Sequence, residues 1–380
     1  MELDIYFKNV GQGDTIFLHW DNNNKFGLID CNLVNKKITH VIKHIEQHSI
    51  KEFEFMLMSH PHSDHFSGFP ELLGYCESKG IVIKKFFHTA TFVPRRLDQL
   101  FEVNHDKNDH YEKATSSVNR RKHKDLLWSL FTRLDEQHKI RPNGFIKAVH
   151  TITNDYPIAF PGFFQMNFLA PYDYDEFEQY IRQTYNISRN ERWQMTTQYE
   201  NNPKGNFLSS LIQIAGYSGN WQVLLCSDVT EYTLRRISDN DMEFNQILNK
   251  ELKAAQIPHH GSDKNHYPIF WDKLNNVGNA HAVISVGNGY GHPHVRVINY
   301  FKEKCQSVHA TNYVGGFKDA FEMAPPEESI VLMGLIMDIP GISVGPANEV
   351  VAWEDNTRCG EKLLKIISED GNTSCDIIDV

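Results

Sequence analysis

Four side chains that bind metal ions well are crowded into six consecutive residues near the start of the chain. The segment reads Ser-His-Pro-His-Ser-Asp-His over residues 59–65 and follows the largely apolar run 53–58. An apolar run of this length is typical of a buried strand, so the four ligands are expected in the loop after that strand. Chance alone would produce this spacing roughly a few times in a thousand chains of this length.

The spacing within the segment suits two neighbouring metal positions. His60 and His62 are two residues apart, so on an extended segment their side chains point the same way. Asp64 and His65 follow directly and face a second position nearby. The pattern therefore favours two divalent ions over one.

Two more carboxylates and a pair of histidines also follow predicted strands. They are Asp30, after residues 26–29; Asp228, after residues 222–226; and His259 with His260, after residues 254–258. In layered α/β folds, sites form where strands run out into loops. These residues are therefore expected to complete a two-metal centre that keeps an open position for substrate.

Composition narrows the class of protein. The 380 residues carry a formal net charge of −10, which argues against a general electrostatic nucleic-acid binder. The start of the chain lacks the pattern of a secretory signal, and the longest apolar stretch, residues 330–342, is too short to span a bilayer. Six scattered cysteines favour reduced thiols. We therefore expect a cytoplasmic protein with no membrane association, and the sequence indicates no oligomeric state.

Strand and helix patterns alternate along the chain, which predicts a layered α/β architecture. Residues 88–150 differ: they hold twelve Lys and Arg against eight Asp and Glu, a net charge of +4 (12 − 8), and show few strand signals. They are interpreted as a mostly helical insertion whose basic run contains Arg120, Arg121, Lys122 and Lys124. The insertion is either a solvated cap or a basic lid that contacts an anionic substrate.

One helix pattern imitates a metal motif. His44 and His48 are four residues apart in the predicted helix 36–48, but the glutamate between them fits neither order of the zincin motifs. We expect both to be exposed helix residues.

Six short motifs in chain order resemble those of a known family. They are Val-Gly-Gln-Gly-Asp-Thr at 10–15, Leu-Ile-Asp at 28–30, the histidine segment at 59–68, Leu-Leu-Cys-Ser-Asp at 224–228, Pro-His-His-Gly-Ser at 258–262 and Gly-His-Pro at 291–293. Together they resemble the metallo-β-lactamase superfamily, most closely its ComEC-like branch, named for the hydrolase domain of a bacterial DNA-uptake protein. The resemblance covers residues 1–325 apart from the insertion. It implies a four-layer αββα sandwich, with residues 326–380 as a C-terminal β-rich extension.

The resemblance also implies a role for each residue of the centre. His60 and His62 would hold the first metal, Asp64 and His65 the second, Asp228 would bridge both, and His259 is preferred over His260 to complete the second. Asp30 would orient the ligand loop. Asp64, His260 and His292 are the predicted catalytic residues, the two histidines as proton donors to the leaving group, although His292 could simply cap the following helix. Ser262 and the basic run would contact substrate.

One departure from the family pattern concerns the first metal. Many members have a third histidine ligand between the histidine segment and the bridging aspartate, whereas residues 206–211 here contain none. The ComEC-like branch resembles this chain in having Asn and Ser there. Water or substrate would then complete the first metal.

These features predict a hydrolase with two divalent ions, zinc by preference and manganese as an alternative. A metal-bridged hydroxide would cleave a phosphodiester in DNA, RNA or a nucleotide. A small-molecule esterase, lactonase or phosphorylcholine-esterase-like enzyme is the first alternative. A degenerate metal-binding scaffold without turnover is the second.

Overall fold

The computed structural model describes residues 1–89, 144–152, 157–171, 209–217, 219–286, 293–311, 361–369 and 372–380, with short pieces inside 126–134 and at 206, 342–344 and 350–353. The chain folds as two compact units. The first unit comprises Met1–Ile29, Pro157–Asn167 and Leu211–Val380, and the second comprises Asp30–Tyr156 and Phe168–Ser210.

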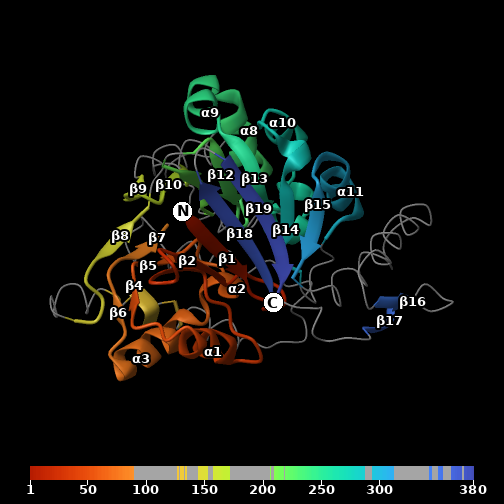
Figure 1. Ribbon diagram of the computed structural model, residues 1–380. Coiled ribbons are helices and arrows are strands. Elements are labelled where there is room, and N and C mark those ends of the chain that lie inside the picture. Colours follow the sequence, from red (N-terminus) through yellow and green to blue (C-terminus); the bar gives the residue numbers. More distant parts are fainter. Residues whose placement is uncertain are drawn as a thin grey trace, which may run out of the picture. The chain divides into compact units, whose positions relative to one another are not determined.

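The first unit contains an antiparallel sheet built from both ends of the chain (Figure 1). Its strands, in spatial order, are β19 (Asn372–Asp379), β18 (Lys362–Glu369), β1 (Glu2–Phe7), β2 (Ile16–Trp20) and β3 (Lys25–Ile29). The turn between β2 and β3 contains Asp21, Asn22 and Asn23, all with positive φ. Asp and Asn adopt this left-handed backbone more readily than most residues, which explains the polar run at the turn.

The core of the first unit also contains a seven-stranded sheet. Its order is β15 (Ser307–Ala310), β14 (His281–Ile284), β13 (Glu251–Gln256), β12 (Trp221–Leu225), β11 (Leu211–Gly216), β10 (Phe164–Ala170) and β9 (Ile158–Phe160). Strands β12 to β15 run parallel, and each crossover between them contains helices. These helices are α8 (Glu231–Asp239), α9 (Asp241–Ile247), η3 (Pro258–Gly261), η4 (Asp263–Asn265), α10 (Pro268–Asp272), η5 (Val277–Asn279) and α11 (Val295–Lys304).

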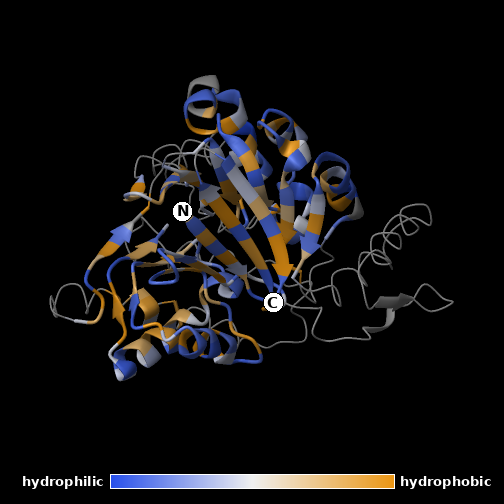
Figure 2. Ribbon diagram, viewed as in Figure 1, coloured by the Kyte–Doolittle hydropathy of each residue, from blue (hydrophilic) through white to orange (hydrophobic). Residues whose placement is uncertain are grey.

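The two sheets of the first unit pack against each other. The Trp20 ring of β2 lies 4.9 Å from the ring of Phe160 and 5.2 Å from that of Phe164, measured between centroids. At the other end, Nε2 of His281 contacts the carbonyl oxygen of Cys375 at 3.2 Å. Figure 2 shows hydrophobic residues concentrated on these strands. Full burial of one Phe side chain contributes roughly 1.5–3 kcal/mol, so such contacts dominate the stability of the core.

The second unit combines short parallel strands with helices. Its elements are α1 (Thr39–Gln47), β4 (Glu52–Phe53), β5 (Phe55–Met58), α2 (Ser63–Phe66), α3 (Phe69–Lys79), β6 (Val82–Ile83), β7 (Phe86–His88) and β8 (Val149–Thr151). Strands β5, β7 and β8 are parallel neighbours, and β4 pairs with β6. Strand β5 is buried on both faces, which suits its continuous apolar sequence. The remaining short strands, β16 (Ile342–Val344) and β17 (Val350–Trp353), form a separate antiparallel pair.

The predicted α/β class is confirmed by these mixed sheets and helices. The helix predicted over 36–48 begins later, at Thr39, because Val34 and Lys37 form a bridge ahead of it. The basic run of Arg120, Arg121, Lys122 and Lys124 lies outside the described residues. Within the part of the chain that the structure describes, no helix has the length and apolar character needed to cross a membrane.

Candidate metal centre

The second unit holds the histidine segment in a fixed geometry after β5. The His60 and His62 rings lie 4.6 Å apart between centroids, and those of His60 and His65 lie 4.2 Å apart. His62 is the last extended residue before α2, and Asp64 lies in the first turn of that helix. His60 and His65 are fully buried, whereas His62 and Asp64 are half-buried. The four predicted ligands of this segment therefore gather around one short helix.

Asp30 anchors this segment from the loop after β3. Its Oδ1 accepts the backbone N–H of Ser59 at 2.6 Å, and its Oδ2 accepts the Ser59 hydroxyl at 2.6 Å. Its Oδ2 also lies 2.7 Å from Nδ1 of His65. Because a carboxylate only accepts hydrogen bonds, Nδ1 of His65 carries the proton and its metal-binding electron pair is on Nε2.

Ser59 fixes the neighbouring imidazole in the same way. Its hydroxyl oxygen lies 3.1 Å from Nδ1 of His60. The single hydroxyl hydrogen is donated to Asp30, so the His60 ring is the donor in this contact and its electron pair is also on Nε2.

Ser210, in the stretch 206–211 that contains no histidine, has a structural role in the second unit. Both the N–H and the hydroxyl of Ser210 donate to the carbonyl oxygen of Ser59, at 3.1 Å each. The Thr89 hydroxyl donates to the same oxygen at 3.0 Å. Ser210 therefore holds the backbone of the histidine segment. The sequence indicates no role for the Ser59, Thr89 and Ser210 side chains, because single serines and threonines carry no spacing signal.

The first unit holds a second set of predicted ligands. Asp228 follows β12 and is 1% exposed, and its Oδ2 lies 3.4 Å from Nε2 of His259. Its Oδ1 lies 3.8 Å from Nε2 of His260. The two histidines therefore approach the same carboxylate, one at each oxygen.

Backbone strain is concentrated where these side chains are presented. Ser227, His259 and His260 have φ values of 44°, 45° and 52°, and a left-handed non-glycine residue costs roughly 1–3 kcal/mol. Gly261 continues the left-handed run with φ of 80°, and a Cβ there would lie 2.7 Å from Pro293. Only glycine fits at that position. Such strain is common where side chains are held for binding or catalysis.

Hydrogen bonds also assign the protons of both histidines in the first unit. Nδ1 of His259 lies 2.7 Å from Oδ1 of Asn265, whose amide nitrogen donates to the carbonyls of Asp228 and Val229. Nδ1 of His260 lies 3.0 Å from the carbonyl oxygen of Ser285. Both Nδ1 atoms face oxygen acceptors, so both electron pairs are on Nε2, toward Asp228.

Of the remaining predicted site residues, the structure describes Ser262. Ser262 is 3% exposed, and its backbone N–H donates to the carbonyl oxygen of His259. His292 and the basic run of the insertion lie outside the described residues.

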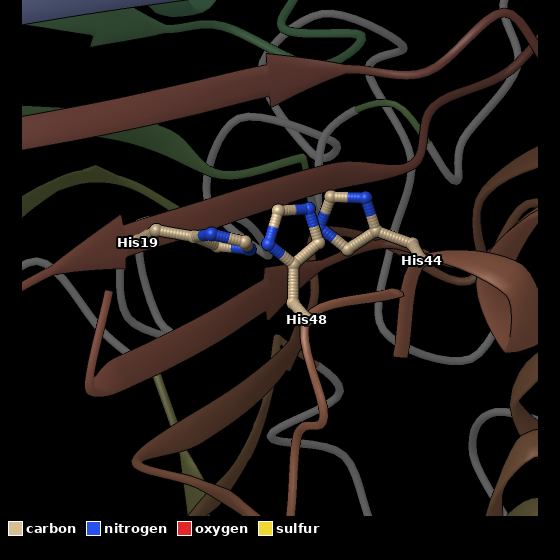
Figure 3. A group of neighbouring side chains, drawn as sticks. All are labelled: His19, His44 and His48. Atoms are coloured by element: carbon tan, nitrogen blue, oxygen red, sulfur yellow. The ribbon is translucent and has the colours of Figure 1, made fainter. Parts of the chain in front are cut away.

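His44 and His48 depart from the expectation of exposed helix residues (Figure 3). His44 is only 1% exposed, and its ring lies 4.4 Å from that of His48 between centroids. The apolar face of α1 turns His44 inward, because it shares that face with Val41 and Ile45. His19, also labelled in Figure 3, belongs to β2 of the first unit, where its Nδ1 contacts the Asn23 side chain at 3.2 Å.

Three solved structures illustrate what the chain is similar to. The metallo-β-lactamase fold protein YhfI from Bacillus subtilis matches at 10% identity and a TM-score of 0.39, over 82% of this chain and 96% of that one. A diphosphatase from the PhnP family matches at 10% identity and a TM-score of 0.33, over 74% and 85%. The short form of human tRNase Z matches at 10% identity and a TM-score of 0.36, over 82% and 93%. No protein-family model and no curated protein matches the sequence. What the chain does therefore has to be inferred from its own residues.

Proposed function

We propose that the chain is a metal-dependent hydrolase that cleaves phosphodiester bonds. The observation that carries this proposal is the proton arrangement on three of the proposed ligands. In His60, His65 and His259, Nδ1 contacts an oxygen acceptor, so the electron pair of each ring is on Nε2. Metal-binding histidines are oriented in this way by the partner of their other ring nitrogen.

The distances in the first unit support a cation between side chains. Two ligand atoms on one tetrahedral zinc, each about 2.0–2.1 Å from it, lie about 3.3 Å apart. Nε2 of His259 is 3.4 Å from the Asp228 carboxylate, and in a neutral ring with its proton on Nδ1 neither atom has a proton to share. An ion between the two atoms removes the repulsion between their electron pairs.

We assign the ligands as the sequence predicts. His60 and His62 hold the first ion, and Asp64 and His65 hold the second. Asp228 contributes to both, and His259 completes the second. The proposed metal is zinc or manganese, because imidazole and carboxylate accept both.

Two divalent ions would supply a water of lowered pKa and charge stabilisation for a phosphoryl group. The chain's own residues keep the ligands in place: Asp30 holds His65, and Asn265 holds His259. His260 and His292 are the proposed proton donors to the leaving group. We propose an anionic substrate, DNA, RNA or a nucleotide, contacted by Ser262 and by the basic run at 120–124.

The test combines metal content with turnover of bis-p-nitrophenyl phosphate. Wild type, Asp64→Ala and Asp228→Asn are stripped of metal and reloaded with zinc or manganese. We expect two ions per wild-type chain and metal-dependent cleavage, with loss of at least one ion and of cleavage in each variant. A loss in both variants supports the assignment of Asp64 and Asp228 as metal ligands.

His48→Gln is the matched control, because it removes a half-buried imidazole outside the proposed ligand set. It should retain both ions and full turnover. Two bound ions without phosphodiester cleavage would redirect the search to esters and lactones. A wild-type chain that binds no metal when supplied with it would refute the proposal.

A further inference from the structure

A buried carboxylate in the first unit lies outside the proposed ligand set. Asp14 is 1% exposed and comes from the Gly-Gln-Gly-Asp turn between β1 and β2. Gly11 and Gly13 have φ values of 71° and 108°, which make this turn possible. Burying a carboxylate is costly unless hydrogen bonds satisfy it, so the contacts of Asp14 indicate what it is held for.

One contact leads to the turn that carries Asp228. Oδ2 of Asp14 accepts the side-chain amide N–H of Gln256 at 2.7 Å. This fixes the orientation of the amide, and its Oε1 accepts the backbone N–H groups of Cys226 and Ser227, at 3.0 Å each. Ser227 is one of the strained residues and immediately precedes Asp228. Asp14 therefore holds this turn through a single intervening side chain.

The other contact leads to His260. Oδ1 of Asp14 accepts the Ser285 hydroxyl at 2.6 Å. The carbonyl oxygen of the same serine accepts Nδ1–H of His260 at 3.0 Å. One carboxylate is thus connected both to the turn that carries the proposed metal ligand Asp228 and to His260, the neighbouring proposed proton donor.

We propose that Asp14 is a positioning residue that sets the geometry of Asp228 for metal binding and that of the neighbouring proton donor His260. This inference rests on the proposed function and extends it to a residue that touches neither metal nor substrate. An ionised carboxylate is suited to the role, because it accepts from both Gln256 and Ser285 at once and makes these bonds stronger than a neutral acceptor would.

The hydrogen-bond pattern allows an exchange test. Asp14→Asn places a second amide donor opposite the Gln256 amide, and Gln256→Glu places a second carboxylate opposite Asp14. The double variant Asp14→Asn with Gln256→Glu restores complementarity: the introduced amide donates to the introduced carboxylate, which still accepts from Cys226 and Ser227. The net charge is also unchanged.

Metal affinity is measured by chelator competition with zinc, and ligand geometry by the visible spectrum of the cobalt-loaded protein. We expect each single variant to lose affinity by about 10- to 100-fold and to change the cobalt spectrum. The double variant should return to within a few-fold of wild type, with the wild-type spectrum. Ser285→Ala should weaken binding as a second, milder variant.

Thermal unfolding of the metal-free proteins checks folding. If Asp14→Asn does not fold, Gln256→Glu, the double variant and Ser285→Ala carry the test. Unchanged affinity in the folded single variants overturns the inference, and so does a double variant no better than the weaker single one. A wild type that binds no metal refutes the proposed function itself, which distinguishes the two failures.

Discussion

Asp30 is hydrogen-bonded to His65 although the two are 35 residues apart, and the next residue, Cys31, bonds the same histidine. Nδ1 of His65 donates to Oδ2 of Asp30 at 2.7 Å, and the backbone N–H of Cys31 donates to the carbonyl oxygen of His65 at 2.8 Å. Gly68 adds a further backbone hydrogen bond between the two segments, since its N–H donates to the carbonyl oxygen of Cys31. The loop after β3 and the helix α2 therefore hold each other by side chain and backbone together.

Asp30→Asn should lower metal affinity by about 10- to 100-fold, because one oxygen of the acceptor becomes a donor facing His65 or Ser59. Zinc competition with a chelator measures the loss. Asp4→Asn is the matched control, a buried aspartate in β1 of the first unit whose pKa is raised by burial. A loss of affinity in Asp4→Asn as large as in Asp30→Asn would contradict a specific role for Asp30.

Gly68→Ala should destabilise the second unit by about 1–3 kcal/mol. An added Cβ would lie 2.5 Å from Sγ and 2.8 Å from the carbonyl oxygen of Cys31, far inside contact distance. Urea unfolding measures the change. Gly74→Ala in α3 is the control, since its Cβ would meet only Arg133 at 3.7 Å. That variant should be neutral or stabilising by up to about 1 kcal/mol, because alanine favours the helix.

His259→Gln and His260→Gln should separate the two roles assigned to this pair. We expect His259→Gln to lose about one bound ion, because its Nε2 is the nearer to Asp228. His260→Gln should keep its metal but lose turnover as a proposed proton donor. Metal analysis and bis-p-nitrophenyl phosphate turnover distinguish the outcomes, and the reverse pattern would exchange the assignments.

His266→Phe should make the protein less sensitive to acid. Burial, and then the charge of Arg296, lower the pKa of His266 from 6.5 to about 4. Between these values the unfolded chain binds a proton that the folded chain does not, so the His266 contribution to stability falls as the pH drops from 6.5 to 4. Phe fits beside the ring of Tyr300, which lies 4.6 Å away. Urea unfolding at pH 7 and pH 5 should show a smaller difference for the variant; an equal difference would contradict the prediction.

The sequence was most informative where chemistry and spacing coincide. The histidine segment follows a buried strand, Asp30 comes directly after β3, and Asp228 lies in the turn that follows β12, as the motifs indicate. Asn265, Gln256 and Ser285 could not be predicted in the same way. They are ordinary polar residues whose partners depend on tertiary packing, and only the Asp14 that links two of them stood in a recognised motif.

The sequence pattern also did not predict that His44 is buried or which distant strands pair. His44 was interpreted as exposed because a histidine on an amphipathic helix resembles a surface residue, yet it lies on the buried face of α1. The strand character of residues 362–379 could be anticipated, but its register could not, because alternation along a strand does not identify its neighbour.

The pairing of β1 with β18 has a consequence for how the chain is made. Glu2 lies opposite Ile367 and Phe7 opposite Lys362, so β1 is paired on one side by a strand that is synthesised long after it. Until residues 362–369 are synthesised, β1 has only β2 beside it and an open edge that can attract other chains. The antiparallel sheet of the first unit is therefore completed only after β18 and β19 are translated, and a chain cut before β18 would present that edge permanently.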